Sequence, residues 1–272
     1  MVDHSTDRRQ LTTAAYANGA NLAVRQSIYR YQQPQLHFVD WAIVQIEWGG
    51  VRTAIDVGCG NGAYLRRLLG RVPRLVGVDL SRGILADAAH AWTADTSASL
   101  AVADAQALPL RAGCADVVLA MHMLYHVPDI PAAVRELRRV LRPGGVLLAA
   151  TNGEPHLREL FDLLVQAVDH VGGATTTLER SFMRFTAENG SEFLNTAFAR
   201  IEWRPAVSAL VVPEAGPIIE YLSSMRNWVE HALPARVTWE GCMAEVANLV
   251  GAHVARAGAL RIATAAGVFV CG

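Results

Sequence analysis

The chain has 272 residues, of which 52% are hydrophobic, so it is long enough to bury a full core. Its 24 basic and 25 acidic residues are interleaved and leave a formal charge of -1, which argues against a nucleic-acid or acidic-membrane surface. No apolar stretch approaches the roughly 20 residues needed to cross a bilayer, and the four cysteines show neither C-x-x-C nor metal-ligand spacing. We therefore expect a cytoplasmic protein with small-molecule partners and without disulfide, metal or membrane contact; homo-oligomerisation stays open.

The first 50 or so residues have helical spacing. Leu36, Val39 and Ile43 recur along one helical face after Pro34. We expect residues 1–50 to form a helical cover that closes over a ligand.

A glycine-rich loop occupies residues 56–62, between a short apolar strand and a helix-like segment. Gly58 and Gly60 let the strand turn sharply into the helix and let the backbone approach a ligand. Asp79 lies 21 residues after Gly58, at the end of the next expected strand, Leu75–Val78. A carboxylate in this position can accept both hydroxyls of a ribose, so the sequence predicts a nucleotide-type cofactor here.

The following elements alternate between strand and helix. Ser81 and Asp129 are good N-caps for helices with an apolar face, and Pro143-Gly144-Gly145 ends the second of these helices. The expected strands cover residues 53–55, 75–78, 100–103, 115–121 and 146–150. Five β-α repeats predict a Rossmann-like, doubly wound α/β fold with a mostly parallel sheet, whose ligand binds at the carboxyl ends of the strands.

Residues 153–272 add further elements to this core. We expect an amphipathic helix over 155–171, a strand over 198–204, helical patterns over 218–229 and 243–254, and a last apolar strand over 261–270. No repeat or linker marks an independent second domain. We therefore expect a cover (1–50), a cofactor-binding core (51–152), and lid helices with last strands that complete the same sheet (153–272).

Two cofactor classes fit the loop. Gly58-x-Gly60-x-x-Ala63 also satisfies the dinucleotide fingerprint, so an NAD-dependent oxidoreductase has to be considered. Asp56, however, would repel a pyrophosphate but suits a cationic amino-acid ligand. Asp104-Ala105 and Met121 end the third and fourth strands, where they suit an adenine edge and an adenine face. The chain has no lysine, which counts against a Tyr-x-x-x-Lys oxidoreductase site.

With these residues the sequence resembles the class I S-adenosylmethionine (SAM)-dependent methyltransferases over about residues 52–151, and Leu124–Asp129 resembles their small-molecule subgroup. The resemblance implies an antiparallel final strand, matched by Arg261–Val270. It also implies cofactor roles. Asp56 and Gly58 to Gly60 would border the methionine part, Asp79 would hold the ribose, Leu80 and Met121 would line the adenine, and Asp104 with Ala105 would bind its amino edge.

SAM carries an already electrophilic methyl group, so the protein mainly has to align a nucleophile and exclude water. Tyr125 and His126 follow the fourth strand, where this fold places side chains beside the transferring methyl group. We predict that they form the catalytic site, with His126 as base or substrate orienter; the alternative for His126 is a hydrogen bond within its loop. Strand alternation would turn His122 to the other side, as a packing residue.

The N-terminal cover adds two candidate cofactor contacts. Arg25 is suited to pair with the SAM carboxylate and Tyr16 to close over it; the alternative for Arg25 is a solvated helix face. The candidate acceptor-pocket residues are aromatic or lie just past the fifth strand, and the aromatic ones have ordinary core packing as their alternative. They are Tyr29, Phe161, Tyr221 and Trp228, together with Asn152 and His156.

The sequence thus predicts a SAM-dependent methyltransferase that acts on the carbon, nitrogen or oxygen of a small organic acceptor, in specialised metabolism. The alternatives are an NAD-dependent oxidoreductase and a catalytically silent SAM-binding protein.

Overall fold

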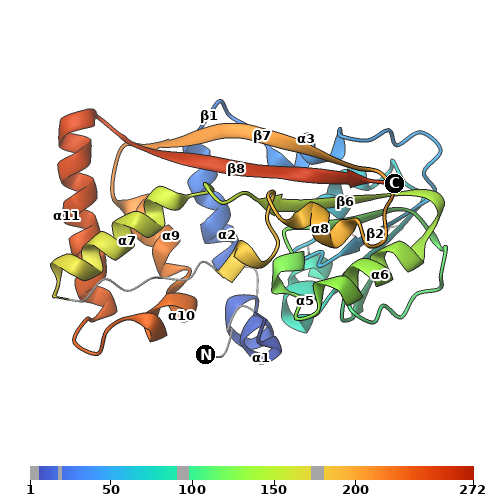
Figure 1. Cartoon of the computed structure of the whole chain (residues 1–272), viewed down its shortest axis with the longest axis horizontal. Coiled ribbons are helices and arrows are strands. Elements are labelled where there is room, and N and C mark those ends of the chain that lie inside the picture. Colours follow the sequence, from blue (N-terminus) through green and yellow to red (C-terminus); the bar gives the residue numbers. More distant parts are fainter. Residues whose placement is uncertain (1–5, 18–19, 91–97, 173–180) are drawn as a thin grey trace.

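A computed structural model of the chain describes residues 6–17, 20–90, 98–172 and 181–272. All strands lie in one eight-stranded sheet with the order β1-β7-β8-β6-β5-β2-β3-β4. Figure 1 shows β7 and β8 running along much of the length of the molecule, above β6. The strands are β1 (Gln32–Gln33), β2 (Thr53–Val57), β3 (Arg74–Asp79), β4 (Ala98–Val102), β5 (Ala115–Met121), β6 (Leu141–Asn152), β7 (Ile201–Val212) and β8 (Leu260–Cys271).

The expected parallel core is present in β4, β3, β2, β5 and β6, which pair in parallel in that order. β8 runs antiparallel to β6, as the resemblance implied, and β7 pairs with β8 along all 12 of its residues. β6 begins earlier than expected because Leu141 already pairs with Ala115, before a register shift in the ladder. The sheet is therefore parallel on one side and antiparallel on the other, with β5 and β6 at the junction.

The helices follow the predicted pattern with different boundaries: α11 is longer than the expected 243–254, and the expected 218–229 pattern is divided between α9 and α10. Asp129 caps α6 through a hydrogen bond from the Ala132 N–H to its carboxylate (2.9 Å), as expected of an N-cap residue. The expected helix after Pro34 is limited to six residues, and the end of the expected helix after Ser81 lies outside the described residues. The helices are α1 (Arg8–Gln10), α2 (Ala20–Ser27), α3 (Phe38–Ile43), α4 (Ala63–Leu68), α5 (Arg82–His90), α6 (Ile130–Val140), α7 (Arg158–His170), α8 (Gly190–Leu194), α9 (Gly216–Ser223), α10 (Arg226–Val229) and α11 (Trp239–Ala257), with short turns η1 (Leu11–Ala15), η2 (Ile28–Tyr31), η3 (Leu124–His126), η4 (Ser181–Arg184) and η5 (Glu230–Ala232).

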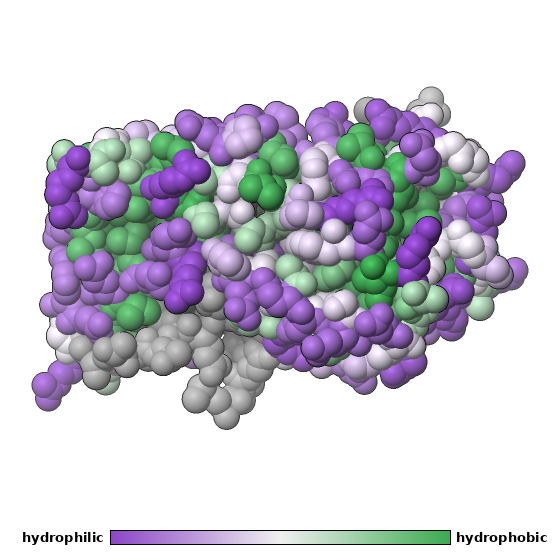
Figure 2. Space-filling view, turned by 45° about the horizontal axis from the view of Figure 1, so that its top comes forward, coloured by the Kyte–Doolittle hydropathy of each residue, from purple (hydrophilic) through white to green (hydrophobic). Residues whose placement is uncertain are grey.

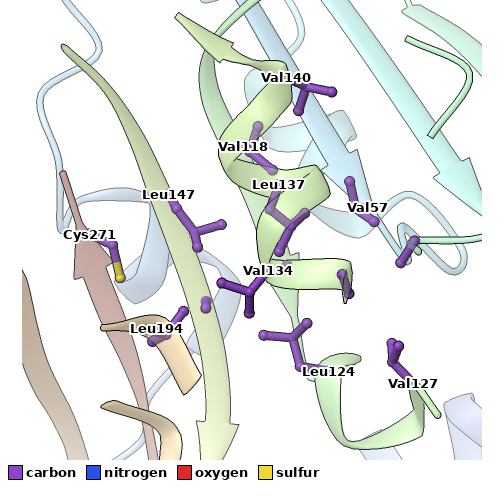
Figure 3. Close-up of a cluster of buried hydrophobic side chains, with 14 of the residues drawn as sticks. Val57, Val118, Leu124, Val127, Val134, Leu137, Val140, Leu147, Leu194 and Cys271 are labelled. Atoms are coloured by element: carbon purple, nitrogen blue, oxygen red, sulfur yellow. The ribbon is translucent and has the colours of Figure 1, made fainter. Parts of the chain in front are cut away.

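Buried side chains form three clusters. Two of them cover the two faces of the parallel strands, and Figure 3 shows one, in which Val134 and Leu137 of α6 meet Val118 and Leu147 of the sheet. The third joins α7, α9 and α11 to the end of β7 and the start of β8, at the left of Figure 1. The molecule thus has a parallel core region and a cap region, the latter defined as α7, α9, α10, α11 and the adjoining β7–β8 residues.

The N-terminal elements α1 and α2 lie below the sheet, between these two regions (Figure 1). On the face drawn in Figure 2, polar side chains surround scattered apolar groups. Within the described part of the chain, no helix combines the length and apolar character needed to cross a membrane.

Candidate functional site

A large cavity of about 1470 Å³ lies at the carboxyl ends of the parallel strands. It is bounded by the ends of β2, β3, β5 and β6, by the N-terminal elements, and by residues of β7, β8 and α9. The sheet order places the glycine loop to one side of β5 and the antiparallel strands to the other. The cavity therefore has a cofactor half along β2–β4 and an acceptor half along β6, β8 and β7.

The glycine loop is held by the backbone of the neighbouring strand. The N–H groups of Gly58 and Cys59 both donate to the carbonyl of Val78, at 2.7 and 3.0 Å. Gly58 has a φ of +71°, and a Cβ there would stand 2.8 Å from the Cβ of Met123. Glycine is required at this position both for the left-handed conformation and for the close approach of Met123. Gly58 and Gly60 line the cavity, as predicted.

Asp79 ends β3 with its carboxylate fixed from two sides. Gly60 N–H donates to Oδ2 and Ser81 N–H to Oδ1, both at 2.9 Å. Burial raises the pKa of the Asp79 carboxyl, and the hydrogen bonds from backbone N–H groups oppose that rise. Each oxygen keeps a further lone pair, and the residue lines the cavity, so it is oriented in advance to accept a diol.

Asp56 is placed differently from its prediction. It is fully buried within β2 and is not among the residues that line the cavity. Neither carboxylate oxygen has a hydrogen-bond partner among the described residues. Burial, and then the charge of Asp79, raise the pKa of Asp56 to about 8. The expected contact with a cationic ligand is therefore wrong in this structure, because the residue is the last but one of a central strand and lies below the loop rather than in it.

The far end of the cofactor half contains the other predicted contacts. Leu80, Asp104 and Ala105 line it, as does Met121 from the end of β5. Asp104 Oδ1 accepts from the backbone N–H of Gln106 (2.9 Å), and its Oδ2 lies 3.5 Å from the guanidinium of Arg8. The N-terminal segment therefore reaches across this end of the cavity.

The middle of the cavity brings together residues that are far apart in sequence. The Tyr16 hydroxyl lies 3.0 Å from Nε2 of His126, and the two rings meet edge to face. The guanidinium of Arg25 stands over the Tyr16 ring at 5.3 Å, and the Tyr125 ring meets the His126 ring at 4.6 Å. Ser81 Oγ donates to the Tyr16 carbonyl (2.7 Å), which ties the cover to the cofactor half. Arg25 is thus not on a solvated helix face.

His122 lines this cavity, although strand alternation predicted a packing role. Its φ of +56° turns the chain immediately after β5, so alternation no longer holds. The ring stacks on Phe38 at 5.0 Å, and burial lowers the pKa of His122 to about 4. His122 is therefore a neutral imidazole beside Met121. Residue types alone do not predict the bend that follows β5.

The acceptor half contains four of the six predicted pocket residues, namely Tyr29, Asn152, His156 and Tyr221. Phe161 was expected in the acceptor pocket, but it is buried in the core of the cap region, on α7, and is not among the residues that line the cavity. The alternative of ordinary core packing holds for it because its α7 face packs onto α11 and the sheet. The side chain of Trp228 lies outside the described residues.

Sequence reasoning missed two polar residues in the acceptor half, Gln32 of β1 and Thr264 of β8. Thr264 had a signal, since it interrupts an otherwise apolar strand, and its hydroxyl meets that of Ser208 at 3.1 Å. Gln32 had none, because its position depends on pairing with Leu210, distant in sequence. Among the described residues, no group of three or more His, Cys, Asp or Glu side chains is arranged to hold a metal ion.

Parts of the chain are similar to known proteins. A family model described as "Methyltransferase domain" matches residues 55–149. The 2-methyl-6-phytyl-1,4-hydroquinone methyltransferase of Synechocystis is 34% identical over 119 residues, which are 41% of this chain and 37% of that relative. Other relatives are a malonyl-[acyl-carrier protein] O-methyltransferase of Serratia marcescens and a 23S rRNA (guanine(748)-N(1))-methyltransferase of Streptomyces fradiae, of which the matches cover 41% and 43%. The chain thus spans about two fifths of the curated relatives' length.

Solved structures match over more of the chain. The YcgJ protein of Bacillus subtilis covers 86% of this chain, and 97% of itself, with a TM-score of 0.58 and 15% identity. A phosphoethanolamine N-methyltransferase of Haemonchus contortus, solved with phosphomonomethylethanolamine and S-adenosylhomocysteine, covers 98% of this chain and 59% of itself, with a TM-score of 0.56 and 17% identity. The expected Rossmann-like fold class is confirmed.

Proposed function

We propose that this protein, whose residues 55–149 belong to the methyltransferase domain family, is an enzyme that transfers a methyl group from SAM to a small organic acceptor. The predicted resemblance to class I SAM-dependent methyltransferases is confirmed by the family match and by the shared fold. The observation that carries the proposed reaction is the single cavity that joins Asp79 to His126 and continues over β6, β8 and β7.

The residues of the cofactor half fit SAM. We assign the ribose to Asp79, whose two oxygens are already oriented by backbone N–H groups. The adenine belongs between Leu80 and Met121, with Asp104 and Ala105 at its amino edge. Gly58 and Gly60 border the methionine part, and Arg25 is the cationic group available for its carboxylate.

Asp56 supports this site from below the loop. A buried carboxyl without partners is stable in its protonated form, which the pKa of about 8 favours at neutral pH. A charge on Asp56 would repel Asp79 across the parallel pairing of β2 and β3. We therefore assign Asp56 a structural role in place of a ligand contact.

SAM supplies an electrophilic methyl group, so the chain has to hold the acceptor in line with it and exclude water. We assign His126 as the base for an acceptor that must lose a proton, because it lies at the junction between β5 and the acceptor half. Tyr16 holds the imidazole through the 3.0 Å contact with Nε2, and Tyr125 packs against the ring. Both contacts limit the orientations of His126.

A small acceptor is supported by the way the cavity is built. Its acceptor half is covered by α2, η2 and α9, and its lining comes largely from residues outside the matched 55–149 segment. The acceptor half is thus built mainly by elements outside the matched segment, and we propose a role in specialised metabolism. The Synechocystis relative is named for an organic acceptor, 2-methyl-6-phytyl-1,4-hydroquinone.

Methyl transfer is tested with SAM labelled in its methyl group and small-molecule extracts. The expected result is a labelled product heavier than its precursor by one CH2, and fragmentation then locates the label on carbon, nitrogen or oxygen. Equilibrium titration accompanies it. SAM binding without product across extracts would favour a silent binder, and NADH binding without SAM binding would overturn the proposal in favour of an oxidoreductase.

A further inference from the structure

Among the polar side chains of the acceptor half that the methyl transfer itself does not use are Gln32, Tyr29 and His156. Gln32 pairs with Leu210 on β7, and Leu210 pairs with Ile262 on β8. Residues directly opposite one another in an antiparallel ladder share a face of the sheet, and so do residues two apart in one strand. Gln32 therefore lies on the same face as Thr264, which also lines the cavity.

His156 has its tautomer fixed by the backbone. The N–H of Ala265 donates to Nδ1 of His156 at 3.1 Å, so Nδ1 carries no hydrogen and the neutral ring carries its hydrogen on Nε2. Nε2 lies 3.1 Å from the Tyr29 hydroxyl. His156 is thus the donor in this contact and the Tyr29 oxygen is the acceptor.

The Tyr29 hydroxyl keeps its own hydrogen available. Its oxygen has no second hydrogen-bond partner among the described residues, and Tyr29 lines the cavity. Burial raises the pKa of Tyr29 well beyond its ordinary value, so the O–H group stays intact at physiological pH. Tyr29 therefore presents a hydrogen-bond donor to an oxygen of a ligand.

Gln32 presents the complementary group. Its side chain is 7% exposed, and its Oε1 is buried with no hydrogen-bond partner among the described residues. A buried amide oxygen without a partner is unfavourable, so the site gains from a ligand that brings an N–H or O–H group. Tyr29 in η2 and Gln32 in β1 are three residues apart in sequence, and both line the same cavity.

Two of the charged groups that line the cavity are paired with neighbours. Asp40 pairs with Arg67 at 2.7 Å, and Arg30 contacts the Tyr31 hydroxyl at 3.3 Å and stands over the Tyr31 ring. Tyr221, Ala206 and Ala266 also line the cavity. This environment favours a neutral ligand with a flat, largely apolar body.

We propose that Tyr29, oriented by His156, and Gln32 form the recognition site for the methyl acceptor, and that this acceptor is a neutral, flat molecule with one hydrogen-bonding edge. The edge pairs a carbonyl-type oxygen, which accepts from Tyr29, with a neighbouring N–H or O–H group, which donates to Gln32. Amides, lactams and hydroxylated aromatic ketones have this edge. The inference rests on the proposed function for the identity of the ligand as acceptor.

The test uses benzamide as a probe, because its amide group has both halves of the edge. Binding to the full chain saturated with S-adenosylhomocysteine is followed by ligand-observed NMR titration. We expect benzamide to bind more tightly than N,N-dimethylbenzamide, which lacks the N–H group, and than benzoate, which is charged. Tyr29→Phe and Gln32→Leu should each weaken benzamide binding by about tenfold, and Gln32→Leu should also remove most of the preference over the dimethyl compound, because only Gln32 contacts the N–H group.

Two neighbours serve as matched controls. Tyr31 and Gln33 are not among the residues that line the cavity, so Tyr31→Phe and Gln33→Leu should leave benzamide binding unchanged. Unaltered melting temperature and S-adenosylhomocysteine affinity show that a variant is folded. If Gln32→Leu does not fold, the wild-type preference for benzamide over its dimethyl form decides the matter.

The inference is overturned if wild-type protein binds the three probes equally or not at all, or if Tyr29→Phe binds benzamide as tightly as wild type. Failure of the proposed function is distinguishable, because it appears as absence of SAM binding or of methyl transfer while the probe preference persists.

Discussion

The cofactor half and the acceptor half of the cavity are built by different kinds of contact. In the cofactor half, backbone groups close in sequence hold the site, as in the bond from Gly60 N–H to Asp79, 19 residues apart. In the acceptor half and at the junction, side chains distant in sequence meet: Tyr29 contacts His156 across 127 residues, and Tyr16 contacts His126 across 110. Local backbone geometry therefore shapes the proposed cofactor half, whereas tertiary packing shapes the proposed acceptor half.

The largest expected effect tests whether backbone geometry carries cofactor binding. Gly58→Ala places a Cβ 2.8 Å from Met123 Cβ in a residue at φ +71°. The left-handed conformation alone costs about 1–2 kcal/mol, and the clash displaces the loop. We expect S-adenosylhomocysteine to bind about 100-fold more weakly, measured by calorimetry.

The control for this variant is Gly144→Ala. Gly144 also has a positive φ, +73°, but a Cβ there meets nothing within 4 Å. The control should lose a similar amount of stability and retain its affinity for S-adenosylhomocysteine. Equal affinity losses in the two variants would show that general destabilisation, rather than loop geometry, explains the result.

A second change removes a side chain from the cofactor half. Asp79→Ala deletes the carboxylate that backbone N–H groups orient toward the cavity. Loss of hydrogen bonds to a charged group should weaken SAM binding by about 1.5–3 kcal/mol. The exposed Asp162→Ala is the control, and an unchanged SAM dissociation constant in Asp79→Ala would remove Asp79 from the ribose site.

A third change tests the role given to Asp56. Its pKa in the folded protein, about 8, lies above the ordinary 3.8, so the folded state binds this proton more tightly than the unfolded state does. The stability that the proton contributes is complete below about pH 4 and is lost as pH rises toward 8. Asp56→Asn should remove this loss, so that between pH 5 and pH 7 the variant gains about 3 kcal/mol relative to wild type.

Denaturant unfolding of wild type and Asp56→Asn at several pH values provides the measurement. The opposite dependence from His122, whose lowered pKa makes stability rise between about pH 4 and 6.5, is present in both proteins and cancels in the difference. A difference that does not change with pH would mean that Asp56 is ionised in the folded protein.

The same contrast explains how far the sequence alone could go. The fold was predictable because β5 is apolar except for Asp116 and is bounded by turn signals, and it is found over the expected residues 115–121. The glycine loop and Asp79 were predictable because their spacing follows from one β-α-β unit. The site roles proposed for them are open to the experiments above.

The failures lie where geometry depends on more than one element. Residue type placed Asp56 in the loop, but pairing on both sides, with Gly77 and Leu119, buries it in a central strand. His122 departs from alternation through a single backbone angle. Gln32 lines the cavity because the two-residue strand β1 pairs with β7. No local sequence pattern predicts such a short strand.

The smallest expected effect concerns the junction of the two halves. Tyr16→Phe removes the hydroxyl 3.0 Å from His126 Nε2 but leaves the ring beneath Arg25 and the carbonyl that accepts from Ser81. We expect kcat to fall about tenfold, which is less than the whole contribution of a general base because only the orientation of His126 is lost, with KM for SAM nearly unchanged. Steady-state kinetics with the acceptor identified by labelling provide the measurement, and Tyr31→Phe is the control. An unchanged kcat would show that His126 needs no orientation by Tyr16, whereas a rise in KM for SAM alone would assign Tyr16 to the cofactor half.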